Sequence, residues 1–304
     1  MLSGGVEPVW HHSLALDRGP TPFMDHRCPL GSLDRRDFLT IVGVGLLGSL
    51  AGCVRGGSGQ NAAGGAGGAG DAPPPSPPTE APASSLPAVP AARPGKPVVV
   101  TSAPGPTQMM ALTVDDGYCA ECVTGYVDFA ERTGVHLTFL PNGAYRQFWD
   151  PHAARLRPLI AAGQVQVANH TWTHPDVTKL GDAALRGELE RNEGWIEDTF
   201  GITGRPYFRP PYGKHNTRTD EVAARLGYTS ILLWNGTLGD ATLETPEELL
   251  GLADQWMKAG TIMLGHANHP TVLGLFGQLQ QIIADRKLQP VTIDAMFGTS
   301  RAVG

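Results

Sequence analysis

The chain has 304 residues, of which 41% are hydrophobic and 17% are charged, and its formal net charge is −6. This length suits one large domain or two small ones, and the hydrophobic share is sufficient for a packed core. No basic stripe runs through the sequence, and together with the negative charge this speaks against nucleic-acid binding.

The first 53 residues resemble a twin-arginine-type lipoprotein signal. Arg35 and Arg36 precede an apolar run at 38–51, and small residues then lead to Cys53. The run is too short and too rich in glycine for a bilayer span. The resemblance implies cleavage before Cys53, a lipid on that cysteine and an extracytoplasmic location at the cell membrane. The alternative is an ordinary buried helix with a chance cysteine. A start at Met24 would shorten the signal to a normal length.

Residues 54–107 are mostly Gly, Ala, Pro and Ser. Such a segment buries too little apolar surface to offset the entropy of ordering it. The composition therefore predicts a disordered tether over 54–107 and one folded domain over 108–299.

Within 108–299, short apolar runs alternate with longer segments that are ended by glycine or proline. In chain order we expect strand 109–114, helix 121–133, strand 136–140, helix 151–162, strand 165–168, helix 182–200, strand 207–208, helix 219–226, strand 230–234, helix 244–258, strand 261–264, helix 273–286 and strand 290–293. This alternation predicts an α/β fold, a distorted (β/α)7-type barrel of parallel strands with outer helices.

Polar side chains stand where the predicted strands end. They are Asp115, Asp116, His170, Arg209, Trp234 to Asp240, and His266. In α/β barrels the active site lies at the C-terminal ends of the strands, so these residues are expected on one rim.

Two histidines four residues apart, His170 and His174, suggest a metal site. In a helical turn this spacing places both rings on one face. With a carboxylate from another strand end and an open fourth position, they form the ligand set of a catalytic zinc site, although imidazole binds other divalent ions too. An isolated pair with this spacing is more often due to chance or a surface position, and Asp-Gly at 116–117 is also common in turns and helix N-caps.

Together these segments resemble the NodB-homology polysaccharide deacetylases, carbohydrate esterase family 4. Five motifs occur in the family's order over most of the domain. They are Thr113-Val114-Asp115-Asp116-Gly117, His170-Thr171-Trp172-Thr173-His174, Arg209-Pro210-Pro211-Tyr212-Gly213, Asp240 after Trp234, and Leu264-Gly265-His266.

The resemblance implies a role for each matched residue. Asp116, His170 and His174 hold one divalent ion, expected to be Zn2+. Asp115 is the general base for the attacking water, and His266 is the general acid for the leaving group.

Three further residues support them in the same reading. Arg209 keeps Asp115 ionised, the backbone N–H of Tyr212 contributes to the oxyanion site, and Asp240 orients His266. The sequence departs from the family where Ala241 follows Asp240 in place of tryptophan.

Other departures lie close to these motifs. Gly265 stands where the family has a larger apolar residue, which would widen the pocket floor. His269 is read as a solvated loop residue, with a second acid or a metal contact as alternatives. Cys119 and Cys122 suit a structural disulfide outside the cytoplasm, with a redox-active pair or a competing metal thiolate as alternatives.

The resemblance implies metal-dependent hydrolytic removal of acetyl groups from an N-acetylated glycan, such as peptidoglycan, a chitin-like polymer or poly-N-acetylglucosamine. An O-acetyl esterase and a degenerate glycan-binding protein of the same fold remain alternatives. A glycosidase fits less well, because the two catalytic carboxylates of a glycosidase usually lie on separate elements and need no metal, whereas Asp115 and Asp116 are adjacent. We expect a monomer, with the glycan and the membrane as its partners.

Overall fold

The computed structural model describes residues 93–299, and the predicted signal with most of the predicted tether lies outside this range. The strands are β1 Val98–Val100, β2 Met109–Asp116, β3 Leu137–Pro141, β4 Val165–Val167, β5 Tyr207–Phe208, β6 Ser230–Leu232, β7 Gly236–Thr237, β8 Ile262–His266 and β9 Gln289–Pro290. The helices are α1 Ala120–Thr133, α2 Arg146–Trp149, α3 Ala153–Ala161, α4 Asp182–Phe200, α5 Thr217–Arg225, α6 Pro246–Trp256, α7 Phe276–Asp285 and α8 Ile293–Phe297.

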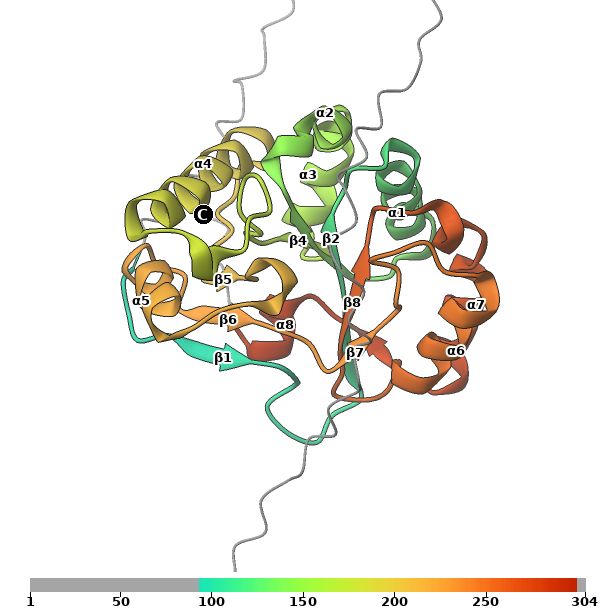
Figure 1. The fold of residues 1–304 in the computed structure, drawn as a ribbon. Coiled ribbons are helices and arrows are strands. Elements are labelled where there is room, and N and C mark those ends of the chain that lie inside the picture. Colours follow the sequence, from blue (N-terminus) through green and yellow to red (C-terminus); the bar gives the residue numbers. More distant parts are fainter. Residues whose placement is uncertain (1–92, 300–304) are drawn as a thin grey trace, which may run out of the picture. The chain divides into compact units, whose positions relative to one another are not determined.

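Strands β2 to β8 form the predicted distorted barrel of parallel strands (Figure 1). One sheet has the order β4-β3-β2-β8-β7, and the other has the order β1-β6-β5. A parallel bridge between Asn169 and Phe208 joins β4 to β5. On the other side, β6 continues through residues 233–235 into β7, which pairs with β8. The two sheets are therefore linked by this bridge and by the chain between β6 and β7, which do not pair with each other in the described residues.

The central strand β2 is buried along almost its whole length, as expected for a parallel strand covered on both faces. Helices α1, α6 and α7 lie together beside the β8 side of the barrel in Figure 1. The inner face of α1 repeats at helical spacing through Val123, Tyr126, Val127 and Ala130, all fully buried. This packing fixes α1 directly behind the strands that carry Asp115 and His266.

The prediction of a disordered segment to residue 107 is wrong for its last part, because β1 lies within it. Val98 and Val100 pair in parallel with Ser230 and Leu232 of β6. Two of the three β1 valines are exposed, so apolar burial alone does not explain the strand. The partner is about 130 residues away in sequence, and composition cannot reveal such a partner. The folded domain therefore begins ahead of residue 108.

Most predicted helices agree with the structure to within a few residues. Helix α4 matches the expected bounds, and Gly201 ends it in the left-handed conformation with φ of 74°. The end of the domain differs. The expected strand 290–293 is only the two-residue β9, and the helix α8 follows it, begun by Thr292 as N-cap.

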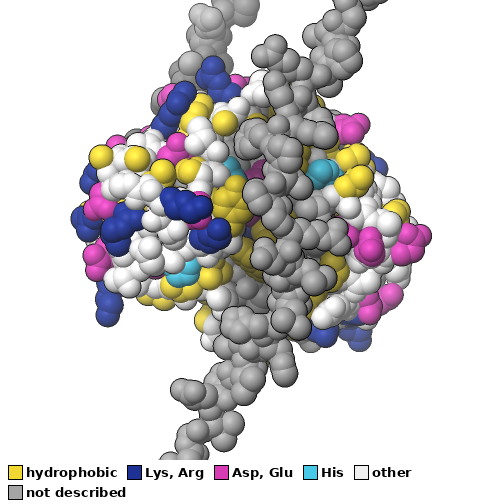
Figure 2. Space-filling model, in the orientation of Figure 1, with side chains coloured by type: hydrophobic (Ala, Val, Ile, Leu, Met, Phe, Trp, Pro, Cys, Tyr) yellow, Lys and Arg dark blue, Asp and Glu magenta, His cyan; other side chains and the backbone are white. Residues whose placement is uncertain are grey.

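On the face drawn in Figure 2, Lys and Arg side chains gather beside α4 and α5, with acidic side chains among them. Arg218 and Arg225 both contact Asp182, at 2.8 and 3.5 Å. Within the described residues, none of the helices is long and apolar enough to cross a membrane.

Candidate metal centre and active site

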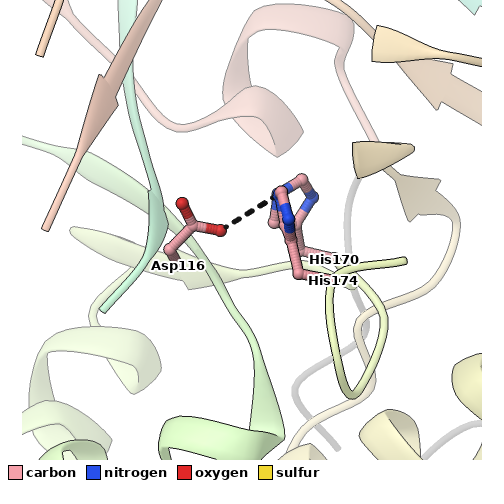
Figure 3. A group of neighbouring side chains, drawn as sticks. All are labelled: Asp116, His170 and His174. Atoms are coloured by element: carbon pink, nitrogen blue, oxygen red, sulfur yellow. Dashed lines mark ion pairs between the residues drawn. The ribbon is translucent and has the colours of Figure 1, made fainter. Parts of the chain in front are cut away.

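Asp116 comes from the end of β2, and His170 and His174 come from the loop after β4. One carboxylate oxygen of Asp116, Oδ1, lies 3.4 Å from Nε2 of His170 and 3.4 Å from Nε2 of His174. The three ligand atoms lie within 4.8 Å of one another. Figure 3 shows the carboxylate facing both rings across a short gap. The three predicted metal ligands are thus brought together.

The hydrogen bonds leave these three side chains in states that suit a cation. Nδ1 of His170 lies 2.8 Å from the carbonyl oxygen of Arg209. Since a carbonyl only accepts, Nδ1 carries a proton, and Nε2 is the ring atom that faces Asp116 and would offer its lone pair to a cation in the neutral ring. Burial and then the neighbouring His170 ring lower the pKa of His174 to about 4, so this ring is neutral near pH 7. Neutral imidazole is the form that binds metal.

The state of the Asp116 carboxylate shows whether these residues fit a bound cation. Its Oδ1 atom is buried and has no hydrogen-bond partner among the described residues. Burial alone would raise the pKa of this carboxyl, but the adjacent imidazoles of His170 and His174 hold the pKa well below its usual range. An ionised, buried oxygen aimed at two imidazole nitrogens fits a divalent cation with mixed N and O ligands.

The backbone around the cluster is not helical, so the predicted helical turn at 170–174 is wrong. The two rings meet because Thr171 and His174 adopt left-handed conformations, with φ of 71° and 59°. Asp116 and Tyr212 do the same, with φ of 65° and 59°. Non-glycine residues rarely adopt this conformation, and such residues concentrate at functional sites.

Asp115 precedes Asp116 at the end of β2 and is held by Arg209. The guanidinium Nη1 donates to Oδ1 of Asp115 at 2.7 Å and to the Thr113 hydroxyl at 2.8 Å. Nε of Arg209 also donates to the carbonyl oxygen of Leu232. Arg209 is fully buried and Asp115 almost so. The second carboxylate oxygen of Asp115, Oδ2, is not bound by Arg209. It lies 3.6 Å from Nε2 of His170 and so faces the predicted metal ligands.

His266 lies next to Asp115, since the two residues are paired across β2 and β8. Oδ1 of Asp240 lies 2.9 Å from Nδ1 of His266, and Oδ2 accepts from the His266 backbone N–H at 3.0 Å. Burial alone would lower the pKa of His266, but the hydrogen bond and charge of Asp240, followed by the charges of Asp115 and Asp116, raise it. The contact expected between Asp240 and His266 is therefore present without a tryptophan at 241.

Tyr212 stands at the edge of this site, in the short 3-10 helix Pro211–Gly213. Its side chain is 63% exposed, and its ring lies 4.6 Å from that of His174. Trp234 lines the neighbouring wall, with its ring centroid 5.7 Å from the Arg209 guanidinium carbon. The side chains of all eight predicted site residues except Tyr212 and His174 are buried.

Residues 102–231 match a family model described as polysaccharide deacetylase. Over this stretch the chain is similar to the polysaccharide deacetylase family. The peptidoglycan-N-acetylglucosamine deacetylase PgdA of Listeria monocytogenes is 28% identical over 64% of this chain and 40% of its own length. The chain spans between 40% and 71% of the length of the first curated relatives that it matches.

Solved structures of the family share the fold. A family 4 carbohydrate esterase from Streptomyces lividans, in complex with acetate, superposes with a TM-score of 0.53 at 26% identity, over 61% of this chain and 93% of that one. A family pseudoenzyme from Bacillus anthracis superposes with a TM-score of 0.58 at 18% identity, over 66% of this chain and 69% of that one. The second likeness shows the fold alone.

Two asparagines that contact the cluster were not identified from the sequence. Nδ2 of Asn268 donates to Oδ2 of Asp116 at 2.7 Å, and its Oδ1 accepts from the Gly117 N–H. Nδ2 of Asn142 donates to the carbonyl oxygens of residues 170 and 171. Both follow strand ends, as Asp116 and His170 do, and that position was the available signal. Their hydrogen bonds hold the Asp116 carboxylate and the loop that carries the two histidines.

Three other residues that the sequence analysis singled out are Cys119, Cys122 and His269. Cys119 and Cys122 form a disulfide, and Cys119 is the N-cap of α1. A bonded Cys119 is not a free thiolate beside Asp116. His269 is not part of the metal-ligand cluster, and its Nε2 lies 3.1 Å from the Tyr118 hydroxyl.

Proposed function

We propose that this chain removes acetyl groups from an N-acetylated glycan, by hydrolysis that depends on one divalent cation. The observation that carries the proposal is the unpaired, buried Oδ1 of Asp116 facing two imidazole nitrogens, with Asp115 and His266 beside it on neighbouring strands. A ligand set, a base and an acid within one rim are the groups that amide hydrolysis needs.

Asp116, His170 and His174 would hold the ion, and Zn2+ suits two imidazoles and a carboxylate with an open position. When bound there, the ion polarises the acetyl carbonyl and makes water more acidic. The hydrogen bond from His170 Nδ1 to the Arg209 carbonyl and that from Asn268 to Asp116 orient the ligands beforehand.

Two residues on neighbouring strands, Asp115 and His266, each carry out one of the two proton transfers. Asp115 takes a proton from the attacking water, because Arg209 occupies one of its oxygens and stabilises the ionised form. His266 donates a proton to the sugar nitrogen as the C–N bond breaks, because Asp240 favours the imidazolium. The backbone N–H of Tyr212 would stabilise the oxyanion, a contribution of about 3–4 kcal/mol in other acyl-transfer enzymes. One water is consumed, and acetate and a free amine are released.

The location and partners of the protein belong to the same proposal. The signal-like segment at 1–53 supports export and a lipid on Cys53, which would place the domain outside the cytoplasm beside the cell-wall glycan. PgdA of Listeria monocytogenes is named for action on peptidoglycan, and the likeness to it supports a glycan of that class. We propose a monomer that acts on this polymer.

Acetate release from N-acetylglucosamine oligomers and from peptidoglycan tests the proposal. We expect release with the zinc-loaded protein, loss of release with chelator, recovery with Zn2+, and loss in the variant Asp115→Asn. An acetylated xylan in parallel distinguishes an O-acetyl esterase, which would release acetate from the ester alone. Glycan affinity without turnover on any substrate, unchanged by Asp115→Asn, would show a degenerate binding protein instead.

A further inference from the structure

Tyr126 of α1 is a fully buried tyrosine whose hydroxyl has no hydrogen-bond partner among the described residues. The other two buried tyrosines differ from it. The Tyr207 hydroxyl lies 2.7 Å from the Thr299 hydroxyl, and the Tyr228 hydroxyl donates to Glu193. Buried polar groups are rarely left unpaired, because an unmade hydrogen bond costs about 1–3 kcal/mol. The Tyr126 hydroxyl therefore calls for an acceptor.

The geometry around Gly265 shows which acceptor faces it. A side chain at 265 would begin at a point 3.3 Å from the Tyr126 hydroxyl oxygen and 3.5 Å from Oδ2 of Asp240. The hydroxyl oxygen of Tyr126 and Oδ2 of Asp240 thus border the same small space, although they are not hydrogen-bonded to each other in this structure. The Leu238 methyl carbon, 3.1 Å away, closes the space. A side chain at 265 would occupy this space and crowd both the hydroxyl and Asp240.

The charges around Tyr126 agree with this assignment. Burial, and then the charge of Asp240, raise the pKa of Tyr126, so the phenol stays protonated and can only act as a donor near that carboxylate. Asp240 is in turn the residue that holds Nδ1 and the backbone N–H of His266. A link from Tyr126 to Asp240 would therefore reach the imidazole.

We infer that Tyr126 is a positioning residue for the Asp240–His266 pair, and that a small shift of its side chain lets the hydroxyl donate to Oδ2 of Asp240 in the space that Gly265 leaves free. The inference rests on the proposed role of His266 as the acid. It also explains the glycine in the fifth motif, where a wider pocket floor was expected. Glycine at 265 leaves the space in which Tyr126 can contact Asp240, the residue that holds His266.

The direction of the effect follows from the hydrogen bond. A donor on Asp240 spreads the carboxylate charge and weakens its hold on the imidazolium proton. Without the hydroxyl, Asp240 should bind that proton more tightly and make His266 a weaker acid. The groups that face the imidazole are Asp240 beside it and Asp115 and Asp116 on β2, and these remain unchanged in the variant.

The test compares Tyr126→Phe with the parent and with Tyr207→Phe, which removes an equally buried hydroxyl that is bonded elsewhere. The His266 imidazole is titrated by NMR in the zinc-loaded protein, so the readout does not need activity. We expect its titration to move to higher pH in Tyr126→Phe and to stay in place in Tyr207→Phe. If the protein is active, kcat should fall about three- to tenfold, the value of one hydrogen bond, with KM little changed.

Gly265→Ala supplies a second, independent arm. Its methyl group should displace the hydroxyl and shift the His266 titration in the same direction, and the double variant with Tyr126→Phe should shift it no further than either single change. An unmoved titration in Tyr126→Phe would overturn the inference, whether or not acetate is released. Absence of acetate release with the expected titration shift would instead count against the proposed function alone.

Discussion

Replacement of Asn268 by alanine should weaken the metal site without touching a ligand. The amide donates to Oδ2 of Asp116 at 2.7 Å in a buried setting, while Oδ1 of the same carboxylate faces the two imidazoles. A hydrogen bond to a charged group contributes about 1.5–3 kcal/mol. Since each 1.4 kcal/mol is about tenfold in a binding constant, the dissociation constant for Zn2+ should rise about 10- to 100-fold, the range found for outer partners of metal ligands.

Competition with a fluorescent zinc chelator measures this change directly. Asn216→Ala is the matched control, because that asparagine caps helix α5 and has no contact with the cluster. It should lower stability by about 1 kcal/mol and leave zinc affinity unchanged. Asp116→Ala should remove tight binding altogether. Parent-like affinity in Asn268→Ala, alongside lost affinity in Asp116→Ala, would refute the argument that the amide orients the carboxylate.

Three further predictions follow from the buried groups. Asp240→Asn should move the basic limb of the kcat/KM profile to lower pH, since the acid loses the charge that raises its pKa and deprotonates earlier; a limb at the parent's pH would contradict this. Arg209→Met should destabilise the fold by about 3–5 kcal/mol in urea unfolding, because it leaves Asp115 charged and unpaired, and Asp115→Asn should restore part of the loss if that reason holds. Gly117→Ala should lower stability by about 2–4 kcal/mol, because φ is 101° and the new methyl would lie 2.1 Å from a buried indole ring; Gly187→Ala, in open space on α4, should be neutral or stabilising.

The barrel and most of the site residues could be predicted because their signals are local. A buried parallel strand is a run of apolar residues, and the polar residue that follows it lies on the rim whatever the rest of the chain does. This reasoning placed Asp115, His170, Arg209 and His266 together correctly. Asp240 was harder to place, since it follows a two-residue strand that no pattern indicates.

What the sequence could not reveal depends on partners far apart in the chain. Strand β1 exists because β6 offers it backbone hydrogen bonds, and Asn268 matters because it lies 2.7 Å from Asp116 across 152 positions. The histidine spacing was read as a helical turn, since the left-handed φ of Thr171 and His174 leaves no trace in their identities. Tyr126 looks like any core residue until Gly265 and Asp240 are seen beside it.

The left-handed backbone conformations around the site would make it difficult to graft onto another protein scaffold. Asp116, Thr171, His174 and Tyr212 are four of the five non-glycine residues with positive φ in the described chain, and each is disfavoured there by about 1–2 kcal/mol. The surrounding barrel imposes these conformations. A graft of the same side chains onto another scaffold would relax into ordinary backbone geometry and scatter the ligands. To move this site to another protein, the strand ends and their loops would have to be moved together with the side chains, because the loop backbone sets the positions of those side chains.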